Sequence, residues 1–126
     1  MSDLALVLDP DDPTPPYEQL RRQLADLVWS GALAPGDRLP PLRQLAGDLG
    51  LALGTVARTY RELETEGLLV TRRGGGTRVA QGAPRFDKAE QLRRLQALTE
   101  AYVARARAIG ATDQQIRDAV RGLAAT

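Results

Sequence analysis

The stretch Leu49–Thr77, LGLALGTVARTYRELETEGLLVTRRGGGT, decides the fold of this chain. It predicts, in order, a short turn, a basic amphipathic helix, an apolar strand, a glycine tip and a returning strand. A helix of this size fits the major groove of duplex DNA, and a basic hairpin beside it can hold the flanking phosphates or the minor groove. The stretch therefore indicates a unit that binds DNA.

The helix of this stretch is expected to run from about Thr55 to Glu66. Its buried stripe is expected to consist of Val56, Tyr60 and Leu63. Arg58 and Arg61 point away from that stripe, either as DNA contacts or as a solvated face paired with glutamates. Thr55 is expected to cap the helix, a role compatible with a phosphate contact. Because glutamates crowd the C-terminal half and would repel phosphates, we expect the N-terminal half to face DNA.

The hairpin is expected to have strands at 69–73 and 77–80, joined by the three glycines 74–76, where a positive φ is free. Three basic side chains surround its tip: Arg72, Arg73 and Arg78. Such residues could blunt the edge of a sheet. Clustered beside a recognition helix, they favour a grip on phosphates instead.

Two more helices are expected before this stretch, over 17–30 and 42–50. Thr14 is the best capping side chain near the first helix. Only about four residues separate the second helix from the third, which is the helix-turn-helix arrangement. Residues 4–8, LALVL, could form a strand or an arm laid on the body.

A tail at 85–126 follows a linker at 81–84 and predicts two helices. The first has apolar residues close to a seven-residue repeat, and the second begins with a capping box of Thr112 and Gln115. A helical hairpin of this size cannot bury both apolar faces alone, so we expect it to pack on the same hairpin of a second chain. The expected interface residues are Leu92, Leu95, Leu98, Tyr102, Ile109, Ile116, Val120 and Leu123.

Composition narrows the chemistry of the chain. With 126 residues and a net charge of +1, the distribution of charge must decide whether nucleic acid is bound. The chain contains neither Cys nor His, which removes thiolate metal sites and the commonest general base. The triple glycine precedes a strand and lacks a following Lys-Ser or Lys-Thr, so it is not a phosphate-binding loop of an enzyme. We expect no enzyme, no cofactor and no metal site.

Sequence patterns also bear on localisation. No apolar run approaches the roughly 18 residues needed to span a bilayer. The acidic N-terminus lacks a basic start and a small-residue cleavage site, so it does not predict a signal peptide. We therefore expect a cytoplasmic protein without a membrane partner.

Four stretches resemble the GntR family of bacterial transcription regulators: PPYEQLRRQL, GALAPGDRLPPLRQLAGDLG, TVARTYRELETEGLL and RRGGGT. Together they cover residues 15–79 with the family's order and spacing. The short tail and the VARTYRELE sequence look like the YtrA-type branch, whose tail mainly serves dimerisation.

The resemblance implies DNA contacts from Arg43 at the start of the second helix, from Thr55 and Arg58, and from the wing around Gly76 and Thr77. Two positions depart from the family pattern. Leu53 cannot recognise a base edge by hydrogen bonding, and Gly75 stands where relatives often have a basic residue. The full set of expected DNA-binding residues is Arg43, Thr55, Arg58, Arg61, Arg72, Arg73, Gly76, Thr77 and Arg78.

These observations predict a mostly α fold with a small β-hairpin. A winged helix-turn-helix is expected at 1–80, the linker at 81–84 and a two-helix dimerisation tail at 85–126. The predicted function is a sequence-specific homodimeric regulator, a repressor that binds an inverted repeat in double-stranded DNA. The alternative is a winged-helix module that binds another protein or bridges DNA without reading its sequence. No small-molecule effector is identified.

Overall fold

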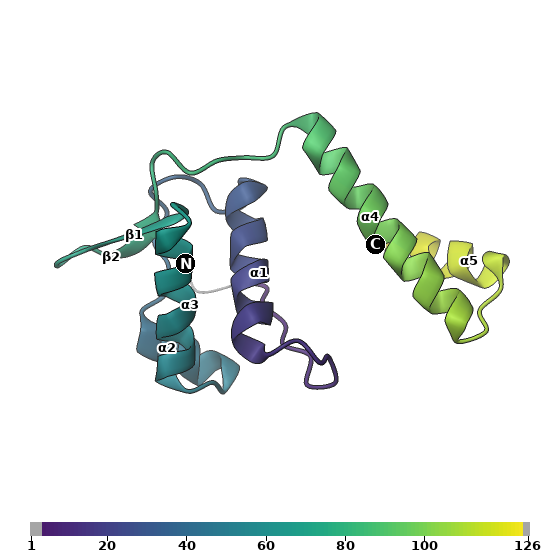
Figure 1. Cartoon of the computed structure of the whole chain (residues 1–126), viewed down its shortest axis with the longest axis horizontal. Coiled ribbons are helices and arrows are strands. Elements are labelled where there is room, and N and C mark those ends of the chain that lie inside the picture. The colour runs from purple at the N-terminus through teal and green to yellow at the C-terminus, as the bar shows by residue number, and fades with distance from the viewer. Residues whose placement is uncertain (1–3, 125–126) are drawn as a thin grey trace. The chain divides into compact units, whose positions relative to one another are not determined.

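The computed structural model describes residues 4–124 of the chain. Its elements are three helices, a hairpin of two strands and two further helices (Figure 1). In chain order they are α1 Pro16–Trp29, α2 Leu42–Leu49, α3 Leu53–Thr65, β1 Leu69–Arg72, β2 Gly76–Val79, α4 Lys88–Ala108 and α5 Asp113–Ala124. The expected mostly helical fold with one β-hairpin is confirmed. The chain forms two compact units, residues 1–85 and 86–126.

The core of the first unit lies between α1, α2 and α3. Fully or almost fully buried side chains recur at helical spacing along α1 and α3: Leu20, Leu24, Val28, Val56, Tyr60 and Leu63. Helix α2 adds Leu45 and Ala46. The Tyr60 hydroxyl donates a hydrogen bond of 2.8 Å to the Pro40 carbonyl oxygen, so the polar end of this core ring is satisfied. This packing holds the helix-turn-helix as one rigid body.

Two helix starts differ from the sequence-based expectation. Helix α1 is preceded by Pro15 and begins at Pro16 with no capping side chain, so the expected Thr14 cap is wrong. Prolines suit this start because their fixed φ matches the first helical position and Pro16 leaves no N–H there to satisfy. Helix α3 begins at Leu53, with Ala52 before it and again no capping side chain, so Thr55 lies inside the helix rather than capping it.

The wing is a two-stranded hairpin that a third, extended segment joins through one isolated bridge. Strands β1 and β2 pair antiparallel from Leu69↔Val79 to Arg72↔Gly76. On the other edge of β2, the segment 37–39 pairs through an antiparallel bridge between Arg38 and Arg78. The Leu39 N–H donates to the Thr77 oxygen over 2.8 Å, and the Val79 N–H donates to the Asp37 oxygen over 2.9 Å. The loop between α1 and α2 therefore anchors the root of the wing.

Residues 4–8 form an arm on the body, without strand pairing in the described chain. Leu4, Leu6 and Leu8 pack against the core of the first unit. The Gln23 side chain on α1 binds the backbone of Val7 on both sides, accepting from its N–H at 2.9 Å and donating to its oxygen at 2.6 Å. The Gln23 side-chain amide thus forms the two backbone hydrogen bonds that a neighbouring strand would otherwise form with Val7.

The second unit is a helical pair with little buried surface. Helix α4 is capped by Asp87, which accepts from the Glu90 N–H at 2.7 Å. The expected capping box at α5 is confirmed: the Gln115 N–H donates to Thr112 Oγ1 at 3.1 Å, and the Thr112 N–H donates to Gln115 Oε1 at 2.8 Å. Within the described part of this unit, Ala106 and Ile116 are the buried hydrophobic residues. Nowhere between residues 4 and 124 is a helix both long and apolar enough to cross a membrane.

Candidate nucleic-acid interface

The N-terminal half of α3 carries the first group of expected DNA contacts. Thr55 is half-buried, whereas Arg58 and Arg61 are exposed on the helix surface. The Arg58 guanidinium carbon lies 3.8 Å from the centroid of the Tyr17 ring, and its Nε donates to Glu62 Oε2 at 3.1 Å. Arg58 is therefore paired with a glutamate, as expected for a solvated face, and it is also exposed, as a contact with DNA requires.

A hollow of about 270 Å³ opens beside Arg58, where α1 and α3 begin. It is lined by Pro16, Tyr17, Leu51, Gly54, Thr55 and Arg58. The fold thus brings two of the expected contact residues, Thr55 and Arg58, to one site. Leu53 is 43% exposed at the start of α3, so the helix presents an apolar side chain beside this site.

Four of the expected arginines form neither an ion pair nor a side-chain hydrogen bond within residues 4–124, whereas Arg78 lacks an ion pair but donates to a backbone oxygen. Within residues 4–124, no Asp or Glu oxygen forms an ion pair with Arg43 of α2, Arg61 of α3, or Arg72 and Arg73 of the wing. All four are exposed. Because their charge is not neutralised within the protein, they are free to attract phosphates.

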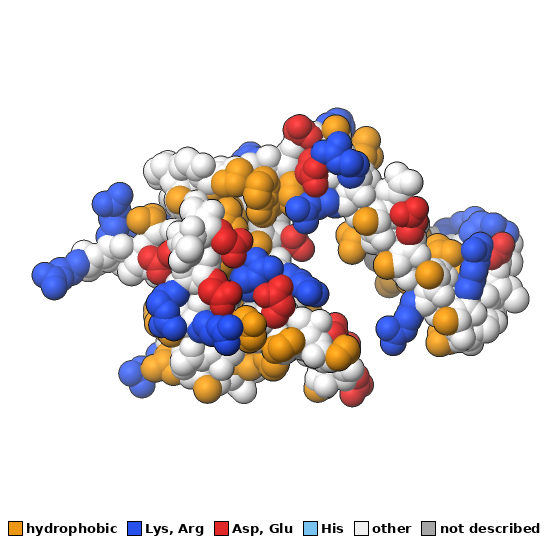
Figure 2. All heavy atoms as spheres, viewed as in Figure 1, with side chains coloured by type: hydrophobic (Ala, Val, Ile, Leu, Met, Phe, Trp, Pro, Cys, Tyr) orange, Lys and Arg blue, Asp and Glu red, His pale blue; other side chains and the backbone are white. Residues whose placement is uncertain are grey.

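The wing has one basic face and one face that continues the core. Side chains alternate along a strand, so Arg72 and Arg78 share a face, and Arg38 joins them because it lies opposite Arg78. Thr71 and Thr77 lie on the other face, with their Oγ1 atoms 2.9 Å apart. Figure 2 shows basic side chains at the projecting end of the hairpin. The wing therefore brings three arginines from three chain segments to a single surface.

Arg38 is a residue of this surface that the sequence reasoning missed. Its Nε and Nη2 atoms lie 3.2 Å from the position that a Cβ on Gly76 would occupy. Gly76 thus makes room for the guanidinium as well as adopting a φ of +69°. Arg78 is held at the same place, since its Nη1 donates to the Gly36 oxygen at 3.1 Å. The signal that could have identified Arg38 is a short extended segment after the Pro35-Gly36 turn.

Acidic side chains near α3 are held by arginines. Arg21 of α1 binds Glu66 at 3.2 Å and Glu18 at 2.8 Å. The hydrogen bond from Arg21 lowers the pKa of Glu18 from 4.5 to about 2, and Arg22 contributes in the same direction. With Glu62 bound to Arg58, two of the three glutamates near the end of α3 have their charge partly compensated.

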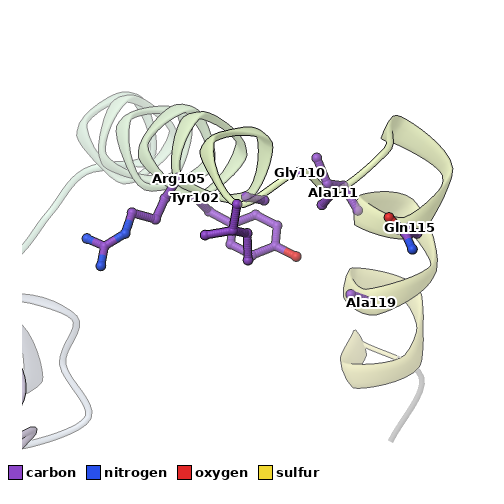
Figure 3. Close-up of a pocket in the computed structure, with 9 residues that line it drawn as sticks. Tyr102, Arg105, Gly110, Ala111, Gln115 and Ala119 are labelled. Carbon is purple, nitrogen blue, oxygen red and sulfur yellow. The ribbon is translucent and has the colours of Figure 1, made fainter.

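The second unit contains an open hollow of about 520 Å³ between α4 and α5 (Figure 3). Its lining is Tyr102, Arg105, Ala106, Ile109, Gly110, Ala111, Gln115, Ile116 and Ala119. Most of these side chains are apolar or small. No group of three or more acidic side chains in the described residues could hold a metal ion.

Comparison with known proteins identifies the family of this chain. The profile described as "Bacterial regulatory proteins, gntR family" matches residues 16–79, which span α1 to β2. The HTH-type transcriptional regulator Rv1152 of Mycobacterium tuberculosis is 46% identical over 109 residues, covering 86% of this chain and 83% of that protein. The HTH-type transcriptional repressor YtrA of Bacillus subtilis is 42% identical over 76 residues, covering 60% of this chain and 58% of YtrA.

Solved structures agree with the sequence relatives. YtrA from Sulfolobus acidocaldarius, a GntR-family transcription factor, superposes with a TM-score of 0.56 at 31% identity, covering 76% of this chain and 97% of that one. The AraR DNA-binding domain in complex with operator ORX1 superposes with a TM-score of 0.53 at 27% identity, covering 60% of this chain and 93% of that one.

Rv1152 and the Bacillus subtilis YtrA are both named as regulators of transcription and not as enzymes. The family similarity spans the helix-turn-helix and the wing, which are the elements that present the unpaired arginines. The chain therefore belongs to the GntR family of bacterial regulatory proteins and is a DNA-binding transcriptional regulator of the YtrA-like subfamily.

Proposed function

We propose that this regulator is a homodimeric repressor that binds an inverted-repeat operator. The observation that carries the proposal is a stripe of large apolar side chains on the second unit that are exposed in the single chain. Leu98 is 69% exposed, Ile109 is 81% exposed and Leu123 is 78% exposed. Further members of the stripe are Leu92, Leu95, Tyr102 and Val120.

A second copy of the chain is the occupant that best fits this stripe. Its residues recur along one side of α4 and continue onto α5, as in helices that pack on a partner. Burying a large aliphatic side chain contributes roughly 1.5–3 kcal/mol, so several such residues from each chain would sustain a dimer. Ile116 is already buried within its own unit, and its role in the proposal is to hold α5 on α4. The hollow beside Tyr102 would receive side chains of the partner.

The DNA contacts follow from the exposed arginines. Arg43, Thr55, Arg58 and Arg61 would contact the major groove and its phosphates. The wing would hold flanking phosphates through Arg72, Arg73, Arg78, Gly76, Thr77 and the additional Arg38. A two-fold dimer presents two such surfaces, which suits half-sites one or more helical turns apart. Repression would follow from blocking polymerase, and its site of action would be the cytoplasm.

Two named relatives support this proposal. The Bacillus subtilis protein YtrA is named as a repressor, and the AraR domain is described in complex with operators. Neither name describes an effector for this chain, and the proposal includes none.

The test combines oligomeric state with DNA binding. A random-sequence selection would first identify the operator. The double variant Leu98→Asp, Ile109→Asp would then be compared with the double variant Ala97→Asp, Ala104→Asp, which puts the same added charge on the opposite side of α4. We expect the Leu98→Asp, Ile109→Asp variant to be monomeric by sedimentation and to prefer a full operator over a half-site by far less than the parent chain does. The control should behave like the parent.

Two results would contradict the proposal. A Leu98→Asp, Ile109→Asp variant that remains dimeric would show that the stripe is not the interface. A selection that enriches no motif would favour instead a module that binds protein or bridges DNA without sequence specificity.

A further inference from the structure

Among the arginines of α2 and α3 expected to contact DNA, Arg58 is held by both a ring contact and an ion pair within residues 4–124. We propose that Tyr17 is a positioning residue, which stacks on the Arg58 guanidinium so that it can recognise a guanine in the major groove. This inference rests on the proposed function, because it assumes that Arg58 contacts a base.

The backbone of Tyr17 lies against α3. Tyr17 is the second residue of α1 and follows Pro16, whose φ is set by its ring. The hydroxyl of Thr59, with no exposed surface, lies 3.2 Å from the Tyr17 carbonyl oxygen. The same hydroxyl lies 3.1 Å from the Thr55 oxygen. Because Thr59 directly follows Arg58 on α3, the packing of α1 on α3 places Tyr17 beside Arg58, where its ring stacks on the guanidinium.

The contacts of Arg58 leave its two terminal nitrogens available. The ring covers one face of the guanidinium, with 3.8 Å between the guanidinium carbon and the ring centroid. Glu62 accepts only from Nε, at 3.1 Å. Within residues 4–124, no acceptor forms a hydrogen bond with Nη1 or Nη2, and the side chain is 54% exposed. The face of the guanidinium thus contacts the Tyr17 ring, while the edge formed by Nη1 and Nη2 is available to DNA.

This arrangement suits guanine for a geometric reason. Arginine recognises guanine by donating two parallel hydrogen bonds from its edge to O6 and N7. An aromatic ring uses the face of the guanidinium and does not compete for those donors. A stacked arginine has also lost much of its rotamer freedom before DNA arrives, which lowers the ordering cost of binding. The adjoining hollow, lined by Tyr17, Thr55 and Arg58 among others, leaves open space beside the guanidinium.

The experiment uses the full dimeric chain and four variants: Tyr17→Phe, Tyr17→Leu, Arg58→Ala and the double variant Tyr17→Leu, Arg58→Ala. Affinity is measured for the selected operator and for operators in which each base pair is replaced in turn. The expected result is that Arg58→Ala removes discrimination at one G·C pair. Tyr17→Leu should weaken discrimination at that same pair by about three- to tenfold and leave the other pairs unchanged. Tyr17→Phe, which keeps the aromatic ring, should retain the discrimination at that pair.

Two further readouts separate positioning from a general structural role. The double variant should discriminate no worse than Arg58→Ala alone, because the ring acts only through the arginine. In the free protein, side-chain NMR of Arg58 should give upfield ring-current shifts that are present in Tyr17→Phe and absent in Tyr17→Leu. The salt dependence of binding should not change in Tyr17→Leu, since no phosphate contact is removed.

Three outcomes would overturn the inference. Equal loss of affinity for every operator in Tyr17→Leu would mean that Tyr17 only supports the fold. Loss of discrimination in Tyr17→Phe equal to that in Tyr17→Leu would mean that the hydroxyl, and not the stack, matters. If Arg58→Ala leaves every base preference intact while the dimer still binds its operator specifically, Arg58 is not the base contact, yet the proposed regulator function stands.

Discussion

The arginines of this chain differ in whether a carboxylate lies within reach. Arg21 and Arg22 of α1 are both bound to Glu18, at 2.8 and 3.0 Å. Arg43 and Arg72, in the part of the chain proposed to bind DNA, have no such partner among the described residues. A guanidinium without an ion pair can bind a phosphate without first breaking a contact within the protein. We therefore expect these residues to contribute most to DNA affinity.

Removing an unpaired arginine should therefore weaken DNA binding without affecting stability. We expect Arg72→Ala to lower affinity for all duplexes by a similar factor and to reduce the slope of log affinity against log salt by about one. Arg22→Ala, which removes an exposed and paired arginine, is the matched control. Fluorescence anisotropy across a salt series measures the affinity and the salt slope of each variant. An unchanged slope in Arg72→Ala would contradict a phosphate contact.

The two positive-φ glycines of the wing separate backbone strain from a side-chain clash. Gly74 has a φ of +78° with nothing within 4 Å of its Cβ position, whereas Gly76 has a φ of +69° and the Arg38 guanidinium 3.2 Å away. Gly74→Ala should cost about 1 kcal/mol of unfolding free energy from strain alone. Gly76→Ala should cost a similar amount from strain, because its neighbour is the end of the exposed Arg38 side chain, but it should also weaken DNA binding because that guanidinium must shift. Urea denaturation measures the two stabilities and anisotropy measures the two affinities. Equal effects of the two substitutions on affinity would contradict the role of Arg38.

At the scale of elements, the helices of this chain begin in different ways. Helix α1 begins on prolines, α4 on the Asp87 cap and α5 on the Thr112–Gln115 capping box. The reciprocal hydrogen bonds of a capping box depend on residues three apart, which is why sequence alone located it. Helix α3 starts earlier than its threonine suggests because the N–H groups of Thr55 and Val56 already donate to the Ala52 oxygen, which is the first acceptor of the helix.

The ion pairs of α1 make its stability depend on pH. The pKa of Glu18 is lowered from 4.5 to about 2 in the folded chain, so its stabilising contribution is complete above pH 4.5 and is lost as pH falls toward 2. Because the arginines are partly exposed, we expect Glu18→Gln to reduce the free energy of unfolding by only about 1 kcal/mol at pH 7. The difference from the parent chain should shrink between pH 4.5 and pH 2 in urea titrations. A constant difference over that range would contradict the assignment.

At the scale of the whole molecule, the chain consists of two units with different degrees of burial. The unit of residues 1–85 has its own core and keeps the segment 81–85 with it, since Ala83 packs against that core. Arg85 approaches the turn that follows α1, because its guanidinium carbon lies 2.8 Å from the position of a Cβ on Gly31. The unit of residues 86–126 leaves most of its large apolar side chains exposed.

This division predicts the outcome of truncation. A chain ending at Arg85 should fold with a cooperative thermal transition, because its core is complete without the tail. It should also be monomeric and bind the operator much more weakly, since it loses the second DNA-binding surface of a dimer. Sedimentation and anisotropy test these expectations. A truncated chain that remains dimeric would contradict the proposed role of the tail.

The amino-acid sequence by itself determined the local features of this protein. Apolar periodicity placed the helices, the triple glycine placed the hairpin tip, and the four family stretches identified the DNA-binding unit. These signals depend on residues close together along the chain, whose spacing reflects helix and strand geometry directly. Only the tertiary structure joined Arg38 to Arg78 across the wing and stacked Tyr17 on Arg58. Those pairs lie about 40 residues apart and become neighbours only when the core forms, so no local pattern could reveal them.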